Sequence, residues 1–529
     1  MSFKNQIKKN DLLYFLIKDN WIIYIQYSKL IKMEKLKELK DHFAEIIRLN
    51  YIRALLGWDQ AVYMPKGGNK GRSEQLALIS QLIHKRVKSE KTNQLIKEAE
   101  KVVNKSEIDA ALIREAKREY EHAIRIPDRL VIEISKTASL GFINWEVAKE
   151  KSDFSIFKPH LEKIIELKKE YAEKLATGPT RYSTLIDLYE PGATYNWISS
   201  VFQELRPQLI KIVKKLNNSN DKPSQAILKK KYDTEKQWQT SIEVIKKLKF
   251  NFDVARQDKS THPFTTSISS NDTRITTRIN EEFLPTCLFG TVHECGHALY
   301  QMGFMEEIHD TLLADGSSMG IHESQSRMWE NIVGRSREFW KFWFPRFQET
   351  FPNVLKDYPL EEFYRSINVV QPSLIRVEAD EVSYALHIIL RFEMEQMIVE
   401  DSVNVDELPG LWNEKMEGLL GVLPPNDAEG ILQDVHWSGG SFGYFPSYAL
   451  GNLYAAQIYN KATSDNPNLA IDIENGNFST LLDYLRENIH QYGKIYYARD
   501  LIKKITGEDL NPKYFINYIQ KKFYPIYGY

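Results

Sequence analysis

The sequence predicts a mainly α protein, in which one large helical domain carries a single small β-sheet. Apolar residues recur at helical spacing along most of the chain after Met33. Alternation typical of strands is convincing only in residues 264–279. Neither an internal repeat nor a linker-like segment divides the chain. Its 529 residues, 43% of them hydrophobic, are enough to bury a large core.

The first 32 residues differ from the rest of the chain, and we interpret residues 1–32 as an N-terminal extension ahead of a domain that spans residues 33–529. Polar residues 18–20 interrupt the apolar run Leu12–Tyr27, so the run is too short and too polar to span a bilayer. It also lacks the continuous apolar region and cleavage site of a secretory signal. We therefore expect a cytoplasmic protein with no membrane partner.

Helical periodicity predicts the other elements in order along the chain. Ser106 and Asp109 are spaced as in a capping box, which predicts the start of one helix after Ser106. The expected helices cover residues 33–60, 72–102, 107–125, 129–150, 157–175, 195–247, 321–345, 360–370, 373–400, 406–419 and 446–462, followed by several helices joined by short loops in 477–525.

The expected sheet is a hairpin. Residues Phe264–Ile268 and Thr273–Ile279 are rich in Thr, Ser and β-branched residues, and Ser270–Asp272 between them is a turn sequence. The hairpin comes directly before the helix that carries the most informative motif of the chain.

The composition excludes several classes of function. The formal net charge of -1 gives no reason to expect a nucleic-acid partner or an acidic membrane surface. The two cysteines, Cys287 and Cys295, cannot form a disulfide framework. On one helix they would lie about 12 Å apart along the axis, which is too far for a bridge.

The informative motif is His293-Glu294-Cys295-Gly296-His297, an H-E-x-x-H sequence. Residues four apart stand on one face of a helix, so His293 and His297 can both reach one tetrahedral ion. Glu294 lies beside the first ligand and can contact the attacking water without binding the metal. Gly296 is a poor helix former, and it suits a point where another segment approaches the backbone.

A catalytic zinc of this kind needs three protein ligands and one open position. The H-x-x-G-x-x-H extension of one peptidase class is absent, so a glutamate from a following helix is the alternative, which gives a His₂Glu site. Glu323 and Glu330 both suit this role, and the residues alone leave the choice open. His322 would point about 100° away from Glu323 on a helix, so the two cannot easily bind the same ion.

Six ordered motifs identify a family. They are His262-Pro263-Phe264, Asp272 to Thr276, His293 to His297, His322-Glu323-Ser324-Gln325, Ile375 to Asp380, and Gly430 to Trp437. From about Met33 to the C-terminus the chain resembles the carboxypeptidase Taq family, the metallocarboxypeptidases of bacteria and archaea. The first 32 residues are its departure from the family pattern.

The resemblance implies a peptidyl-dipeptidase-like, gluzincin-type helical fold with a deep groove, a homodimer, and removal of single C-terminal residues from peptides. By motif position, His293, His297 and Glu323 are the metal ligands and Glu294 is the general base. Glu294 then accepts a proton from the attacking water and passes it to the leaving amine. His436 and Tyr444 are the candidate donors to the oxyanion.

The substrate of such an enzyme is a peptide with a free C-terminal carboxylate, which arginine recognises best. Arg376 and Arg274 are the candidates, and we prefer Arg376, although an i,i+4 ion pair with Asp380 is an alternative for it. Asp272 is expected to order the wall beside the metal together with Arg274. Asp380 is a candidate partner for the second N–H of a metal-binding histidine.

His262, the histidine of the first motif, is a further substrate-binding candidate. We expect one zinc ion per subunit, and a His₂Glu site also accepts cobalt or another divalent ion.

Two alternative functions remain at this point. The first is a zinc oligopeptidase or dipeptidyl carboxypeptidase on a similar fold, in which the arginine lies farther from the metal. The second is an inert peptide-binding helical protein. Glu294 argues against the inert protein, because binding alone needs no base beside the metal.

Overall fold

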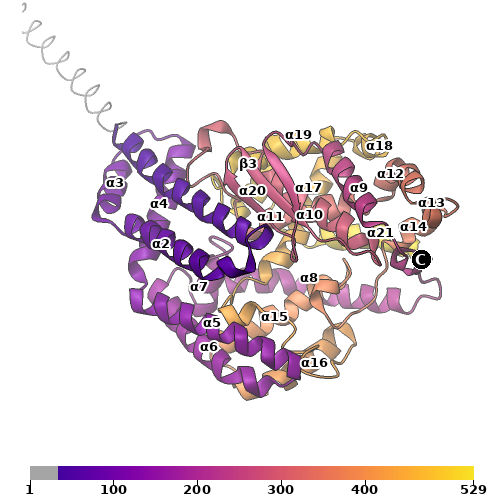
Figure 1. The fold of residues 1–529 in the computed structure, drawn as a ribbon, viewed down its shortest axis with the longest axis horizontal. Helices are drawn as coiled ribbons and strands as arrows, with labels where there is room; N and C mark the ends of the chain where they lie inside the picture. Colours follow the sequence, from indigo (N-terminus) through magenta and orange to yellow (C-terminus); the bar gives the residue numbers. More distant parts are fainter. Residues whose placement is uncertain (1–33) are drawn as a thin grey trace, which may run out of the picture.

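Helices make up most of the structure, a computed structural model that describes residues 34–529 (Figure 1). The predicted mainly α class is confirmed. The expected extension, residues 1–32, lies outside the described residues. No helix within residues 34–529 combines the length and the apolar character that crossing a membrane requires.

The described part begins with a helix over residues 34–62. The helices of the N-terminal half follow as α2 (Asn69–Val87), α3 (Glu90–Glu100), α4 (Glu107–Arg125), α5 (Asp128–Lys151), α6 (Phe154–Leu175), α7 (Arg181–Asp187), α8 (Tyr195–Asn217) and α9 (Thr234–Lys247). In Figure 1, α2, α3 and α4 gather at one end of the molecule, with α5 and α6 beside them.

The C-terminal half is also helical. Its helices are α10 (Leu284–Gln301), α11 (Met319–Arg327), α12 (Arg337–Thr350), α13 (Pro352–Leu355), α14 (Leu360–Ser366), α15 (Tyr384–Val399), α16 (Leu408–Leu420), α17 (Pro446–Asp465), α18 (Leu469–Glu474), α19 (Ser479–Asn488), α20 (Ala498–Thr506) and α21 (Lys513–Ile526). A π-helical turn, η4 (Met328–Val333), continues α11, and a short 3₁₀ turn, η7 (His436–Gly439), precedes α17.

Four of the expected helices are shorter than predicted, and capping residues divide most of them. The Ser89 hydroxyl caps α3, so residues 72–102 form two helices. The Asp233 carboxylate caps α9, which separates it from α8 within 195–247. The π turn and the Ser336 cap break 321–345, and α15 begins only at Tyr384 rather than at residue 373. Periodicity alone did not reveal these breaks.

The sheet has three strands in the order β1-β3-β2. β2 (Thr265–Ser269) pairs antiparallel with β3 (Asp272–Thr277), which confirms the predicted hairpin, and β1 (Ala255–Lys259) pairs parallel with β3. Strand β1 was not predicted, because its residues, Ala-Arg-Gln-Asp-Lys, are mostly polar. β2 is therefore an edge strand.

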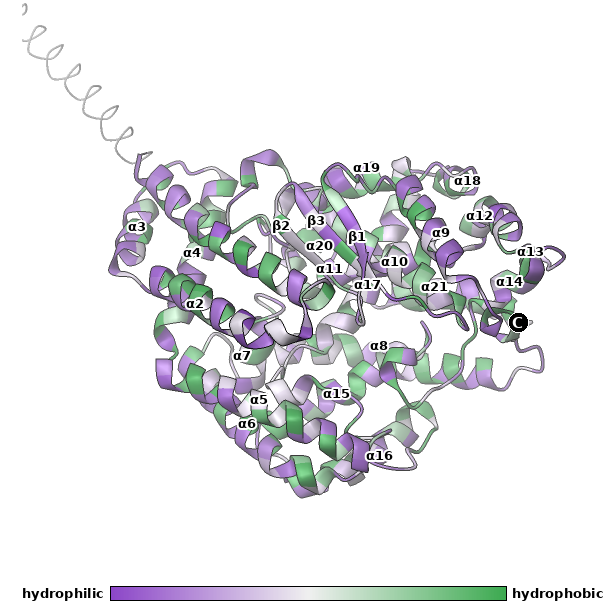
Figure 2. Cartoon of the chain, viewed as in Figure 1, coloured by the Kyte–Doolittle hydropathy of each residue, from purple (hydrophilic) through white to green (hydrophobic). Residues whose placement is uncertain are grey.

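One large hydrophobic core surrounds α10, α11 and α17, whereas the first helices form a smaller core of their own around Leu39, Phe43 and Leu95. Hydrophobic and hydrophilic residues alternate along most helices, as expected where one face is buried (Figure 2). The helix α10 is an exception, because almost its whole length is buried.

Two glycines allow the central helices to approach closely. A Cβ atom on Gly296 of α10 would lie 2.7 Å from the backbone oxygen of Gln325 in α11. A Cβ atom on Gly451 of α17 would lie 2.6 Å from Cγ of Glu323. Both glycines are therefore needed because a neighbouring helix occupies the space that a side chain would fill. This is the close backbone approach expected at Gly296.

A buried carboxyl group holds the start of α11. Oε1 of Glu190 accepts hydrogen bonds from the Gly320 N–H and, at 2.7 Å, from the Ser447 hydroxyl. Glu190 thus ties α11 to α17. Burial raises the pKa of Glu190 to about 7, and the hydrogen bonds only partly offset this effect.

We predict that Glu190 makes the free energy of unfolding fall as the pH rises. The folded protein keeps a proton on Glu190 that the unfolded chain releases above its ordinary pKa of 4.5, so the stabilisation is lost as the pH rises through about 7. The full effect corresponds to about 3 kcal/mol. Denaturant titrations of the wild type and of Glu190→Gln between about pH 5 and 8 measure it. Equal pH dependence in both proteins would contradict the prediction.

Candidate metal centre and active site

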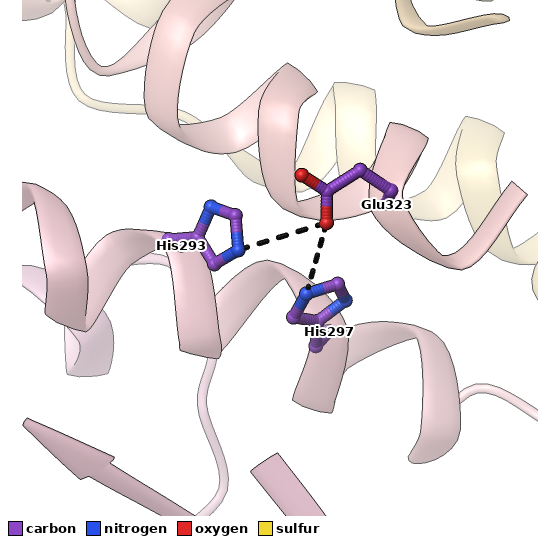
Figure 3. A group of neighbouring side chains, drawn as sticks. All are labelled: His293, His297 and Glu323. Atoms are coloured by element: carbon purple, nitrogen blue, oxygen red, sulfur yellow. Dashed lines mark ion pairs between the residues drawn. The ribbon is translucent and has the colours of Figure 1, made fainter. Parts of the chain in front are cut away.

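Three predicted ligands converge between α10 and α11. His293 and His297 stand one turn apart on α10, and Glu323 faces them from α11 (Figure 3). Oε2 of Glu323 lies 3.8 Å from Nε2 of His293 and 3.6 Å from Nε2 of His297. Candidate ligand atoms of all three residues lie within 4.8 Å of one another.

The donor set fits a divalent ion. Tetrahedral coordination with bonds of about 2.1 Å separates the ligand atoms by about 3.4 Å, which is close to the spacing seen here. Two imidazole nitrogens and one carboxylate are a usual catalytic zinc set. Cys287 and Cys295 are buried and do not belong to this group of candidate ligands.

Other groups hold the far side of each imidazole. Nδ1 of His293 lies 2.9 Å from Oε2 of Glu330, and Nδ1 of His297 lies 3.0 Å from the backbone oxygen of His322. Acceptors at Nδ1 leave Nε2 free to bind a metal. The sequence left Glu323 and Glu330 as alternatives for the third ligand, and these two glutamates differ in position. Glu323 faces both Nε2 atoms, whereas Glu330 lies behind His293.

The expected contact between Asp380 and a ligand histidine is wrong. The carboxylate of Asp380 accepts hydrogen bonds from the Val382 and Ser383 N–H groups, 2.9 Å each, and from the Ser383 hydroxyl at 2.6 Å. Asp380 thus caps the turn before α15, and Glu330 occupies the place expected for it.

The two glutamates share one arginine. Nε of Arg327 donates to Oε1 of Glu323 at 2.7 Å, and Nη1 lies 3.4 Å from Oε2 of Glu330. Arg335 adds a contact of 3.3 Å to Glu330. Burial alone would raise the pKa of Glu330, but the bond to His293 and the charge of Arg327 hold it well below its ordinary value. Glu330 is therefore ionised.

Glu294 lies on α10 directly beside the first histidine. Its side chain is buried, and its Oε2 accepts a hydrogen bond of 2.7 Å from the Thr265 hydroxyl on β2. Burial raises the pKa of Glu294, although His293 and Thr265 act in the opposite direction. Within the described residues no hydrogen bond engages Oε1, so this oxygen remains available to a water molecule.

A second polar cluster contains Arg376, which lies in a short turn rather than in the helix expected over residues 373–400. Nε and Nη2 of Arg376 contact Oδ1 of Asp434 at 3.0 and 2.8 Å. Arg391 donates to the other oxygen of Asp434 at 2.6 Å. The alternative ion pair of Arg376 with Asp380 is therefore absent among the described contacts.

His436 and Tyr444 belong to this second cluster. Their ring centres lie 5.6 Å apart, and Nδ1 of His436 is 3.9 Å from Oδ1 of Asp434. Burial lowers the pKa of His436 to about 4, so its ring is neutral at neutral pH. Burial also raises the pKa of Tyr444, whose hydroxyl therefore stays protonated and able to donate.

One tyrosine joins the two clusters. The Tyr384 hydroxyl accepts a hydrogen bond of 2.9 Å from Nη1 of Arg376. The guanidinium of Arg327 stacks on the same ring, 4.8 Å from its centre. The arginine beside the candidate metal ligands and the preferred carboxylate-binding arginine thus share one aromatic neighbour.

The remaining candidates lie apart from both clusters. Arg274 donates to both oxygens of Asp272, at 2.9 and 2.7 Å, and stacks on Trp58 at 4.3 Å. This pair orders one side of the sheet, but it makes no described hydrogen bond or ion pair with the ligand set. His262 is exposed in the loop before β2.

Six residues of these clusters were not predicted from the sequence. They are Thr265, Arg327, Arg335, Tyr384, Arg391 and Asp434. Two of them could have been found from the sequence. Arg327 follows Glu323 by four residues, which is the spacing of a helical ion pair, and Thr265 directly follows the His262-Pro263-Phe264 motif. Tyr384 and Asp434 depend on segments far apart in the sequence.

A sequence profile described as "Carboxypeptidase Taq (M32) metallopeptidase" matches residues 38–523. The chain belongs to this family. It is a metallocarboxypeptidase, a hydrolase that acts on peptides, as the motif resemblance implied. The alternatives of an oligopeptidase and of an inert binding protein are not favoured.

Relatives match over nearly their full length. "Carboxypeptidase 1" of Bacillus subtilis is 42% identical over 93% of this chain and 98% of its own. "Thermostable carboxypeptidase 1" of Pyrococcus furiosus is 38% identical over 94% and 100%. The solved M32 carboxypeptidase of Deinococcus radiodurans has a TM-score of 0.91 at 35% identity, over 94% of this chain and 100% of that chain.

We predict that Glu330→Gln weakens metal binding about 10- to 100-fold, because Nδ1 of His293 loses its charged partner. Competition with a chelator measures the affinity. Glu349→Gln is the matched control, since Glu349 is exposed on α12 and makes no described contact with the ligand set. Wild-type affinity in Glu330→Gln would refute the role of Glu330.

Proposed function

We propose that this metallocarboxypeptidase uses one zinc ion, held by His293, His297 and Glu323, and that it releases single C-terminal residues with Glu294 as the general base. The observation that carries the proposal is the convergence of both Nε2 atoms on Oε2 of Glu323, with the Glu294 carboxylate on the same helix. The same donor set accepts cobalt or another divalent ion.

Residues of this chain carry out the proton transfers and stabilise the oxyanion. A bound divalent ion supplies Lewis acidity to the scissile carbonyl and lowers the pKa of water. Glu294 takes a proton from the attacking water on Oε1 and delivers it to the leaving amine. Tyr444 donates to the developing oxyanion, with the neutral His436 ring beside it as a second candidate donor.

Arg376 is the proposed receptor for the substrate α-carboxylate. Its cluster holds two guanidinium groups, Arg376 and Arg391, against one carboxylate, Asp434, so one positive charge is left over for an anion. Arg274 is a weaker candidate because Asp272 already balances its charge. His262 is exposed, and its proposed role is limited to the outer part of a bound peptide.

The proposal extends to the organisation of the chain. Residues 33–529 form one catalytic domain, which is supported by the family match over 38–523 and by the large core, and residues 1–32 are an extension.

We also propose that the enzyme is a cytoplasmic homodimer. Exposed apolar residues on α5, among them Ile132, Leu140 and Ile143, offer a surface for self-association. Light scattering that returned the mass of one chain would exclude the dimer.

Product analysis tests the reaction. Zinc-loaded protein should convert an unblocked peptide into a ladder that loses one C-terminal residue per step, followed by mass spectrometry. The same peptide with an amidated C-terminus should be cleaved far more slowly, because it lacks the carboxylate that the Arg376 cluster binds. Internal fragments or dipeptides would instead place the carboxylate receptor elsewhere.

We predict that Glu294→Gln lowers kcat by a factor of about 10²–10⁴, because it removes the general base. Metal affinity should stay at the wild-type value, since Glu294 is not among the candidate ligands. Steady-state kinetics and metal titration of the same preparation separate the two effects. A variant with full activity would disprove the assignment of the base.

A further inference from the structure

Two hydroxyl groups of edge strand β2 point towards α10, the helix that carries both candidate histidine ligands. Thr265 and Ser267 lie two residues apart and therefore on the same face of the strand. The Thr265 hydroxyl contacts Glu294 of α10, and the Ser267 hydroxyl donates to Oε1 of Gln301, also on α10, at 2.6 Å. Thr266 between them points to the other face.

We propose that Thr265 is the positioning residue for the general base. Its hydroxyl holds Oε2 of Glu294, so that Oε1 is presented to the attacking water. This inference rests on the proposed role of Glu294 and goes beyond it, because it assigns to a residue outside the zinc-binding motif the orientation on which that role depends.

The geometry favours the carboxylate as the hydroxyl's acceptor. A threonine hydroxyl has one proton, and two acceptors lie near it: Oε2 of Glu294 at 2.7 Å and the backbone oxygen of Glu294 at 3.0 Å. The carboxylate oxygen is the closer of the two acceptors. A glutamate has three rotatable side-chain bonds, so a fixed contact at one oxygen restricts where the other oxygen points.

Thr265 can impose a position because its own backbone is fixed. The Phe264 N–H donates to the Thr276 hydroxyl at 3.0 Å, and the Thr276 N–H donates to the Phe264 carbonyl at 2.9 Å. The Ser260 hydroxyl lies 2.7 Å from both Oγ1 of Thr276 and the backbone oxygen of His262. The His262-Pro263-Phe264 motif thus anchors the residue that reaches the base.

The test compares three variants of the full-length, metal-loaded enzyme on one unblocked peptide. Thr265→Val removes the hydroxyl and keeps the shape, and it should lower kcat about 10- to 100-fold with little change in KM. Thr265→Ser keeps the hydroxyl and should restore most of kcat. Thr266→Val is the matched control: the change is identical, at the next residue, where the side chain makes no described hydrogen bond. It should leave kcat unchanged.

A double-mutant cycle separates positioning from packing. In the Glu294→Gln background, Thr265→Val should have no further effect on kcat. Wild-type kcat in Thr265→Val, no recovery in Thr265→Ser, or an undiminished loss in the Glu294→Gln background would each overturn the inference. If Thr265→Val does not fold, Thr265→Ala takes its place in the cycle. Full activity of Glu294→Gln would instead refute the proposed base, so the two failures are distinguishable.

A measurement on metal-free protein gives a readout independent of turnover. The free energies of unfolding of the wild type, Thr265→Val, Glu294→Ala and the double variant should show coupling between Thr265 and Glu294, because alanine removes the side-chain acceptor. Metal affinity should be unchanged in Thr265→Val, since neither partner is a candidate ligand. Additive unfolding energies would contradict the hydrogen bond on which the inference depends.

Discussion

The structure of the active site depends on the burial of two carboxylates, Glu323 and Glu330, beside two histidines. A buried carboxylate is costly unless cations or hydrogen-bond donors compensate its charge. Arg327 compensates both glutamates, and it comes from the same continuous stretch of helix and π turn. A divalent ion held by His293, His297 and Glu323 would add further positive charge. A substitution of Glu323, Glu330 or Arg327 would therefore alter both the positions of the ligands and the charge balance of the site.

In the second polar cluster the charges are reversed, because one carboxylate, Asp434, lies between two cations, Arg376 and Arg391. Tyr384 links this cluster to Arg327: its hydroxyl accepts a hydrogen bond from Arg376, and its ring stacks on the Arg327 guanidinium. Tyr384 thus connects the proposed carboxylate receptor to the arginine beside the candidate metal ligands. The family match accounts for the class of reaction, and the unbalanced positive charge of this cluster is the reason for proposing it as the receptor.

The sequence alone was sufficient for those parts of the fold that depend on local patterns. The H-E-x-x-H spacing fixes both histidines on one helical face, and β-branched residues around a polar turn predicted the hairpin. The parts that were missed depend on contacts between distant segments. Arg376 pairs with Asp434, 58 residues away, rather than with Asp380 in its own motif. The choice between Glu323 and Glu330 needed the family resemblance, because both glutamates lie near the histidines and only the path of α11 distinguishes their roles.

Gly296 and Gly451 determine how closely the helices around the metal centre pack, because glycine has no side chain. Because no side chain stands at these positions, α10 and α17 each approach α11 closely, and this close packing sets the separation of the histidines from Glu323. A side chain at either position would push α10 or α17 away from α11 and so displace Glu323 from the two histidines. These two glycines therefore constrain the metal centre, although neither of them supplies a ligand atom.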